Sequence, residues 1–291
     1  MSEKAEANQI KFALPKGRME TGVMKLLDEA GIQLRSSTRT YRPILSLPGF
    51  DTKILKPQNI AEMIHFGSRD LGFAGADWIQ ELQLDVVDLL DTGLDPVRVV
   101  AAAPASLLLN GVLPKRPLIV ASEYERLAKN WIALQQLSAT FVRSYGATEV
   151  FPPEDADCII DNTASGSTLR ANNLQIIDEL MKSSTRLYAN PKAMQDPSKR
   201  GMIEDFLLLI RGVLEARSRV MIEVNVGVDD LDRVLKVIPC MREHTIAPLH
   251  GDAGYAIKAA VPRRDLPSLI PQIKACGGTD IIITSPSQIV P

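Results

Sequence analysis

A segment between a predicted strand and a predicted helix carries the residues best suited to bind an anion. Residues 161–168 read Asp-Asn-Thr-Ala-Ser-Gly-Ser-Thr and follow an apolar run at 158–160. Small residues around Gly166 let consecutive backbone N–H groups converge on one anion, and a helix N-terminus adds partial positive charge. The chain contains no G-x-x-x-x-G-K-[ST], which excludes an ATPase-type P-loop. The pattern predicts a phosphate-monoester cradle with Asp161 beside ribose hydroxyls, or, on spacing alone, an ordinary capped turn.

A second candidate site consists of Lys16, Gly17 and Arg18, which directly follow a strand predicted at 10–14. In open α/β sheets, ligands bind beyond the carboxyl ends of the strands. Two cations beside a glycine suit a triphosphate or a pyrophosphate. A solvated turn is the alternative interpretation of these three residues taken alone.

Two more stretches are candidates for ligand contact. Segment 70–77 reads Asp-Leu-Gly-Phe-Ala-Gly-Ala-Asp, and we single out Asp70 and Gly75 within it. Its glycines permit close approach of the backbone to a ligand, or are plain turn residues. Arg98 lies on a predicted crossover between two lobes, where it faces a cleft or forms an ion pair.

The elements that position these residues alternate through the first two-thirds of the chain. Short apolar runs followed by helical periodicity predict an α/β architecture with mainly parallel strands. A strand predicted at 97–103 leads into a second lobe, and one at 186–190 returns from it. Between them, we predict a helix from the cradle to about residue 181. This path predicts two lobes around a cleft.

A different pattern begins at Val220. Val220, Ile222, Val224 and Val226 alternate with more polar residues, as in a half-buried strand. The elements that follow give the order βαββαβ, which is ferredoxin-like. The predicted domains are 1–99 plus 189–217 for lobe I, 100–188 for lobe II with the cradle, and 218–291 for a C-terminal domain.

The composition is that of a globular protein. With 291 residues, 45% of them hydrophobic and 23% charged, the chain is long enough for two or three domains. A net charge of −2 argues against nucleic acid or a membrane as a partner. Three cysteines in apolar runs and the lack of a long apolar stretch predict a reduced, cytoplasmic protein. The three histidines lack the spacing of a metal site, so any metal ligands stay unknown.

Four ordered motifs resemble those of the ATP phosphoribosyltransferase family in its long form. Residues 161–169 resemble its phosphoribosyl-pyrophosphate (PRPP) loop, Asp-x-x-x-[Ser/Thr]-Gly-x-Thr-Leu. Leu-Pro-Lys-Gly-Arg at 14–18, Lys-Pro-Gln-Asn-Ile at 56–60 and segment 70–77 resemble its other signatures, and residues 220–291 resemble its regulatory domain. Two departures occur: no glycine lies between Glu149 and Asp161, and Asn162 replaces the usual aliphatic residue.

The resemblance implies an activity and a site. The family transfers the phosphoribosyl group of PRPP to N1 of ATP, the first step of L-histidine biosynthesis, in a two-lobed core of the periplasmic-binding-protein type II. It implies Mg²⁺ as cofactor, Lys16, Gly17, Arg18, Asp70, Gly75 and Arg98 at ATP or pyrophosphate, and Glu149 near substrate or ordering the loop. The PRPP-binding residues that it implies are Asp161, Asn162, Thr163, Ala164, Ser165, Gly166, Ser167 and Thr168.

The C-terminal domain resembles an ACT-like ligand sensor. The resemblance implies feedback inhibition by L-histidine, with Asn225, Thr245 and Asp280 as candidate contacts, and a homo-oligomer, a dimer or a hexamer. Alternatively, the domain serves oligomerisation through an exposed sheet edge. For the whole chain, the alternatives are a two-lobed ligand-binding sensor without turnover, or a phosphoribosyltransferase with another acceptor base. The latter enzymes carry two adjacent acids before the loop, whereas Asn162 follows Asp161 here.

Overall fold

The computed structural model describes residues 9–35 and 41–290. Contacts between residues divide the chain into two compact units. The first consists of Met1–Lys25 with Ile32–Ile203, and the second of Leu26–Gly31 with Glu204–Pro291. The division therefore falls within the long helix α8 (Pro197–Ser218) rather than at its end.

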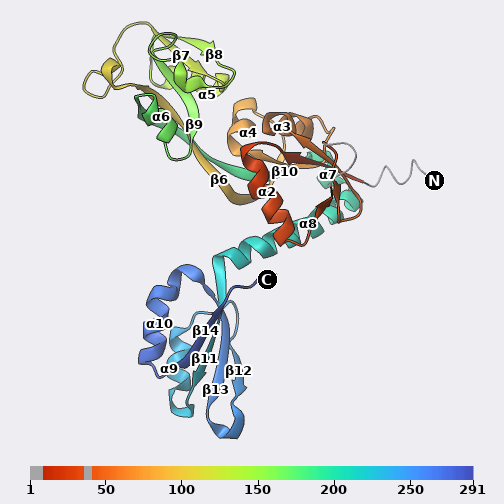
Figure 1. Cartoon of the computed structure of the whole chain (residues 1–291). Coiled ribbons are helices and arrows are strands. Elements are labelled where there is room, and N and C mark those ends of the chain that lie inside the picture. The colour runs from red at the N-terminus through yellow and green to blue at the C-terminus, as the bar shows by residue number, and fades with distance from the viewer. Residues whose placement is uncertain (1–8, 36–40, 291) are drawn as a thin grey trace, which may run out of the picture. The chain divides into compact units, whose positions relative to one another are not determined.

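An eight-stranded sheet forms the first unit and has the order β4-β1-β5-β10-β6-β9-β7-β8 (Figure 1). Strand β1 runs parallel to β4 and β5, and β7 runs parallel to β8 and β9. The bounds are β1 (Ile10–Pro15), β4 (Phe50–Leu55), β5 (Leu71–Gly75), β6 (Val87–Pro104), β7 (Leu118–Ser122), β8 (Ala139–Arg143), β9 (Cys158–Thr163) and β10 (Leu174–Ala189). A separate pair, β2 (Leu34–Arg35) and β3 (Ile44–Leu45), is antiparallel.

Strands β6 and β10 introduce antiparallel pairs at the centre of the sheet. They pair antiparallel with each other along most of their length, β10 is antiparallel to β5, and β6 is antiparallel to β9. The α/β class is confirmed, and four of the seven neighbouring pairs are parallel, whereas the three antiparallel pairs at the centre were not expected. Because β9 and β10 both pair antiparallel with β6, they run in the same direction on either side of it, and the loop with α6 connects them.

Helices cover the sheet of the first unit where the sequence places apolar faces. Helix α3 (Pro57–His65) begins at a proline, whose fixed φ suits the first turn, and buries Ile60, Ala61 and Ile64. These side chains pack with Ala13 of β1 and Ala74 of β5. The other helices are α2 (Arg18–Glu29), α4 (Ala76–Leu82), α5 (Glu125–Leu134), α6 (Ser167–Ala171), α7 (Pro191–Gln195) and α8.

The predicted helix from the cradle to residue 181 is wrong, because α6 ends at Ala171 and strand β10 begins at Leu174. Asn173, with φ of +58°, turns the chain between them. Leu174, Ile177 and Met181 recur at helical spacing, which produced the error. In the structure, shifts of register around Asp178 and Glu179 change which face of β10 these side chains occupy.

The second unit contains the predicted βαββαβ order. Its antiparallel sheet has the order β12-β13-β11-β14 (Figure 1). Alternate residues of β11, from Val220 to Val226, are buried with Val234 of α9 and with Leu269 and Ile273 of α10. The elements are β11 (Arg219–Val226), α9 (Leu231–Val237), β12 (Thr245–Pro248), β13 (Tyr255–Pro262), α10 (Leu266–Ala275) and β14 (Thr279–Thr284).

The lengths and compositions of the helices show whether any of them could span a membrane. Within residues 9–35 and 41–290, every helix is too short or too polar to cross a bilayer. All three cysteines are free thiols, and Cys158 is buried.

Candidate active site

The predicted cradle is a loop that its own contacts hold in shape. Gly166 adopts φ of +73°, a left-handed conformation that favours glycine. Its N–H donates to Thr163 Oγ1 at 3.0 Å, and Arg170 Nη1 donates to the carbonyl of Ser165 at 3.0 Å. Ser165 Oγ lies 3.0 Å from Ser167 Oγ. The loop is therefore preorganised.

A pocket of about 230 Å³ lies over this loop. It is lined by Arg18, Glu149, Asp161, Asn162, Thr163, Ala164, Ser165, Ser167, Thr168 and Leu169. We call it the cradle pocket. The short α6 behind it corrects one expectation, because five residues give a weaker dipole than a full helix. Backbone N–H groups and the hydroxyls of the loop must supply most of the anion contacts.

Asp161 has an unusual environment at the edge of the cradle pocket. Burial, followed by the charges of Glu149 and Glu123, raises its pKa to about 7, against the lowering effects of the Asn162 N–H and of Arg18. The Asn162 N–H donates to Asp161 Oδ1 at 2.7 Å. Shifted carboxyls of this kind cluster at functional sites. Asp161 accordingly titrates close to neutral pH, and Glu149 influences it although the glycine of the family pattern is missing.

A second pocket, of about 290 Å³, shares Arg18 and Asn162 with the cradle pocket. We call it the adjoining pocket. It is lined by Lys16, Arg18, Met19, Pro57, Gln58, Gly75, Asp77, Trp78, Asp95, Val97, Asn162, Ser183, Ser184 and Thr185. Lys16 Nζ lies 5.5 Å from the centroid of the Tyr41 ring, a cation–π contact. Gly17 precedes α2 with φ of +82° and donates to Glu20 Oε2 at 3.2 Å.

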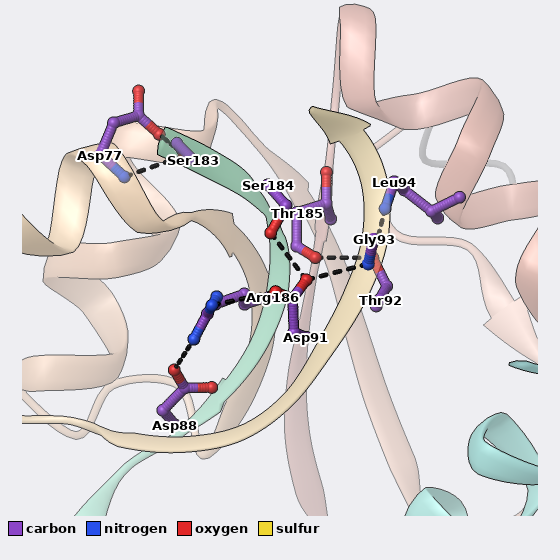
Figure 2. Close-up of polar contacts among 10 residues, drawn as sticks. All are labelled: Asp77, Asp88, Asp91, Thr92, Gly93, Leu94, Ser183, Ser184, Thr185 and Arg186. Carbon is purple, nitrogen blue, oxygen red and sulfur yellow. Dashed lines mark hydrogen bonds and ion pairs between the residues drawn. The ribbon is translucent and has the colours of Figure 1, made fainter. Parts of the chain in front are cut away.

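Three consecutive hydroxyls of β10 form part of the wall of the adjoining pocket. Ser183 Oγ donates to Asp77 Oδ1 at 2.6 Å, and Ser184 Oγ donates to Asp91 Oδ1 at 2.6 Å (Figure 2). Thr185 Oγ1 donates to Asp95 Oδ2 at 2.9 Å. Because each hydroxyl proton is committed to a carboxylate, the oxygens can only accept from a ligand.

The carboxylates behind this wall are themselves fixed. Arg186 donates to Asp88 at 2.6 Å and to Asp91 at 2.9 Å (Figure 2). Burial opposes ionisation of Asp91, but the Ser184 and Gly93 hydrogen bonds and the Arg186 charge lower its pKa overall. Sequence analysis missed these residues. The run of three consecutive hydroxyl residues, Ser-Ser-Thr at 183–185, was the signal that could have revealed them.

Gly75 and Asp77 show why a glycine is needed at the start of α4. A Cβ on Gly75 would collide with the Asp77 carboxylate. Asp77 is buried and accepts from Ser183, so the carboxylate has little room to move. Gly75 thus lines the adjoining pocket.

Asp70 and Arg98 lie apart from both pockets, in contrast to the expectation for them. Asp70 is 5% exposed, and its two carboxylate oxygens accept from Lys199 Nζ and from the Lys11 N–H, each at 2.8 Å. Arg98 donates to Glu179 at 3.2 Å on the strand pair β6 and β10. Both side chains are engaged in ion pairs, and their contact with a substrate stays a prediction.

The candidate effector residues of the second unit separate into two groups. Asn225 Nδ2 donates to Asp280 Oδ2 at 3.1 Å, across the neighbouring strands β11 and β14. Thr245 lies on β12, on the other side of β13, where it pairs with Lys258. The structure therefore brings Asn225 and Asp280 together and leaves Thr245 two strands away.

The acidic residues around the cradle pocket bear on metal binding. In the described part of the chain, no three His, Cys, Asp or Glu side chains form a group that could hold a metal ion. Mg²⁺ in phosphate sites is held by one or two carboxylates together with substrate phosphates. Asp161, with Glu149 and Glu123 close enough to raise its pKa, fits that mode of binding.

Comparison with known proteins extends over nearly the whole chain. Residues 56–212 match the family model of ATP phosphoribosyltransferase, and residues 216–286 match that of its C-terminal domain. An ATP phosphoribosyltransferase of Pelotomaculum thermopropionicum is 33% identical over 288 residues, covering 97% of this chain and all of the relative. One from Solibacter usitatus is 34% identical over 286 residues, covering 97% and 99%.

A solved structure agrees with this comparison. The ATP phosphoribosyl transferase (HisG:HisZ) complex from Thermotoga maritima contains a chain that is 25% identical, with a TM-score of 0.63. The match covers 71% of this chain and 99% of that chain.

Proposed function

Because this chain belongs to the ATP phosphoribosyltransferase family, we propose that PRPP binds in the cradle pocket and ATP in the adjoining pocket. The enzyme transfers the phosphoribosyl group of PRPP to N1 of ATP, in the first step of histidine biosynthesis. The N1–C1 bond forms as the bond from C1 to pyrophosphate breaks, and pyrophosphate leaves with the electron pair. Such displacements pass through an oxocarbenium-like state and need no covalent nucleophile.

The observation that carries the proposal is the shared border of the two pockets at Arg18 and Asn162. A displacement at C1 requires the ribose and the attacking base to meet, while pyrophosphate leaves from the same carbon. With the 5-phosphate on residues 165–168 and the ribose hydroxyls on Asp161, C1 would lie toward that border. Arg18 and Lys16 then provide positive charge for the pyrophosphate and for the triphosphate of ATP.

The hydroxyl wall of the adjoining pocket suits an adenine base. The hydroxyl protons of Ser183, Ser184 and Thr185 go to carboxylates, so their oxygens can only accept. Ser184 is partly exposed and offers the most open oxygen, since the other two residues are buried and Ser183 Oγ already accepts from the Asp77 N–H at 3.1 Å. The exocyclic amino group of adenine is a donor. Guanine and hypoxanthine carry a carbonyl oxygen at that position. This oxygen is an acceptor, so it could not form a hydrogen bond with the hydroxyl oxygens of the wall.

Mg²⁺ would be held by Asp161, with support from Glu149, together with the substrate's own phosphates. When bound, it would offset the charge that develops on the departing pyrophosphate. Asp161 also contacts the ribose in this proposal, so its carboxylate serves orientation and charge together.

At the level of fold, we extend the proposal to the two lobes of a periplasmic-binding-protein type II core and to an ACT-like regulatory domain. The strands β6 and β10, which run the length of the sheet centre, would connect lobe I (1–99 plus 189–217) to lobe II (100–188). The βαββαβ order of residues 218–291 supports the regulatory assignment. Histidine would bind near Asn225 and Asp280, and a homo-oligomer would use the exposed Ile246, Ile282 and Ile283.

One assay tests the function. Pyrophosphate release should require ATP and PRPP together, and Mg²⁺ should be needed for it. Release with a different base in place of ATP would favour the alternative phosphoribosyltransferase. Binding of both ligands without release would favour the alternative of a non-catalytic sensor.

A further inference from the structure

A line of hydrogen bonds connects Arg18 at the border of the two pockets to a buried carboxylate. Arg18 Nη1 donates to Asn162 Oδ1 at 3.3 Å, and Asn162 Nδ2 donates to the Tyr124 hydroxyl at 2.9 Å. Tyr124 in turn donates to Asp77 Oδ2 at 2.6 Å. The line therefore begins at an exposed cation and ends at a buried anion.

The direction of each bond follows from what each group can do. A guanidinium only donates and a carboxylate only accepts, so both ends of the line are fixed. Tyr124 has one proton, which goes to Asp77, and its oxygen can then only accept. An amide at position 162 accepts from Arg18 and donates to Tyr124 at the same time. A carboxylate could not donate, and an aliphatic side chain could do neither.

The inner end of the line is rigid. Tyr124 has no exposed surface, and its ring packs on Trp78 with a centroid distance of 4.8 Å. Asp77 is 6% exposed and is held from its other oxygen by Ser183 (Figure 2). Burial and the Asp77 charge raise the pKa of Tyr124 well above its usual value, so its proton stays in place. Buried networks whose members are all satisfied are stiff.

Arg18, at the outer end of the line, needs a partner that fixes the orientation of its guanidinium. Arg18 is exposed, and a guanidinium on a flexible stem loses side-chain entropy when it is held in one place. Its planar fork binds phosphate well only in a defined orientation. Asn162 contributes one hydrogen bond that sets this orientation, and the rigid Tyr124 sets the orientation of Asn162.

We propose that Asn162 and Tyr124 are positioning residues, which hold the Arg18 guanidinium at the pocket border where the pyrophosphate of PRPP binds. The inference rests on the proposed function, because it takes pyrophosphate as the occupant of that border. It also changes the role expected for Asn162. In the structure its side chain makes one hydrogen bond with Arg18 and one with Tyr124, so we assign it a role through Arg18. The motif that residues 161–169 resemble has an aliphatic residue at the position of Asn162, and such a side chain could form neither of these two hydrogen bonds.

A double-mutant cycle on the full-length protein tests the proposal. Calorimetry should measure the dissociation constants of Mg²⁺-pyrophosphate and Mg²⁺-PRPP for the wild type, Tyr124→Phe, Arg18→Leu and the double variant. Loss of one hydrogen bond in the line should weaken binding by about threefold to tenfold in Tyr124→Phe. In the Arg18→Leu background, the same substitution should have no further effect, because its target is gone.

Two more variants separate positioning from general damage. Tyr188→Phe removes a hydroxyl from a buried tyrosine of β10, outside both pockets, and should leave both dissociation constants unchanged. Asn162→Leu restores the aliphatic type of the family pattern, at a half-buried position that tolerates it. It should reproduce the weakening of Tyr124→Phe, and combining the two should add nothing.

The outcomes distinguish the inference from the function on which it rests. Wild-type protein without release of pyrophosphate from ATP and PRPP would overturn both. Active wild type in which Tyr124→Phe weakens binding equally with and without Arg18 would overturn the inference alone. So would normal binding by a folded Asn162→Leu, with folding checked by the thermal midpoint.

Discussion

Asp70 and Lys199 form a buried ion pair, with Lys199 Nζ 2.8 Å from Asp70 Oδ1. The pair joins the residue before β5 to the first turn of α8. The other oxygen of Asp70 accepts from the Lys11 N–H of β1. One carboxylate therefore connects two strands and a helix. A sequence motif that resembles a substrate-binding turn thus serves, at its first residue, to hold the fold together.

Lys199→Met is expected to destabilise the protein without affecting substrate binding. Removing one partner leaves the Asp70 carboxylate uncompensated, which costs about 3 kcal/mol for a pair that is mostly buried. Denaturant unfolding measures the loss, and titration of PRPP checks that affinity is kept. The matched control is Lys129→Met, whose pair with Glu125 is exposed and should contribute nothing measurable. Normal stability with weakened PRPP binding would return Asp70 to the active site.

The cradle should respond to two substitutions for two different reasons. Thr168→Ala removes one hydrogen bond to a charged phosphate, which is worth about 1.5–3 kcal/mol and predicts a tenfold to hundredfold loss in kcat/KM for PRPP. Gly166→Val forces a β-branched residue into φ of +73° and should abolish PRPP use. Affinity for ATP should be largely kept in both.

Matched controls for the cradle exist elsewhere in the chain. Gly111 has φ of +80° in a different loop, so Gly111→Val imposes the same backbone strain away from the cradle. Thr140→Ala removes an exposed hydroxyl from β8. Both controls should retain PRPP turnover. A folded Gly166→Val enzyme with normal PRPP use would show that the loop does not bind the 5-phosphate.

The shifted pKa of Asp161 predicts a pH dependence. Asp161 accepts more strongly from ribose hydroxyls when ionised, and its pKa of about 7 means that ionisation is completed only above neutral pH. We therefore expect kcat/KM for PRPP to rise with pH through about 7, since this quantity reports the free enzyme. Glu149→Gln removes a charge that raises the Asp161 pKa and should move this rise to lower pH.

The control for the pH experiment addresses PRPP itself. Its phosphate monoester also titrates near pH 6, but it does so identically for every variant. A difference between the pH profiles of two variants therefore reports a group of the protein and not one of PRPP. Glu154→Gln, which neutralises an exposed acid outside the cradle pocket, should leave the profile unchanged. An unshifted Glu149→Gln profile would mean that another group controls the rise.

Many of the strands and helices could be predicted from the sequence, because they have one apolar and one polar face. The alternation from Val220 to Val226 predicted β11, and the structure buries those four side chains. The pair β6 and β10 was not predictable in its full length. Val99, Ala101 and Ala103 pack into one core and Val100 and Ala102 into another, so part of β6 is apolar on both faces and shows no period.

The candidate site likewise combines residues that are close together in the sequence with residues that are far apart in it. Residues 161–168 lie together in sequence, so their loop could be predicted, and seven of them line the cradle pocket. Tyr124 and Asn162 are 38 positions apart, and Asn162 and Arg18 are 144 apart. No local pattern relates such residues, because strand order in the sheet brings them together. Asp70 illustrates the same limit, because its local motif gives no sign of the ion pair with the distant Lys199.

Neutralising Lys16 should weaken binding of a polyphosphate-bearing substrate in a salt-dependent way. Lys16 lines the adjoining pocket and is half-buried, so solvent and salt still reach it. Its attraction to a phosphate is therefore screened as salt is added, because the Debye length falls to about 10 Å at 0.1 M salt. Lys16→Gln should therefore cost more affinity at low salt than at high salt. Separate titrations of ATP and PRPP identify the substrate that it serves. Lys115→Gln, at an exposed position outside both pockets, is the control. An effect on neither substrate would leave Lys16 as part of a solvated turn.

Histidine control is best tested in the full-length chain. A chain ending near Arg217 would keep helix α8 but lose partners of it, such as the Ile289 N–H that donates to the Gly212 carbonyl at 2.9 Å. Point substitutions on β11, β12 and β14 avoid that damage. They also use the finding that Asn225 and Asp280 lie together while Thr245 lies two strands away.

Asp280→Asn should weaken histidine binding, because the carboxylate that would face the ammonium group of histidine is lost, whereas Thr245→Val should leave it unchanged. Coupling between sites is typically about 1–3 kcal/mol and reciprocal for binding. In the wild type, histidine should therefore change the affinity for at least one nucleotide by about fivefold or more, and that nucleotide should change the affinity for histidine by the same factor. Calorimetry of each ligand with and without the other measures both. If Asp280→Asn remains fully inhibited by histidine while Thr245→Val does not, the effector lies near β12 instead. If both remain inhibited, the second unit serves assembly, and histidine acts in the pockets of the first unit.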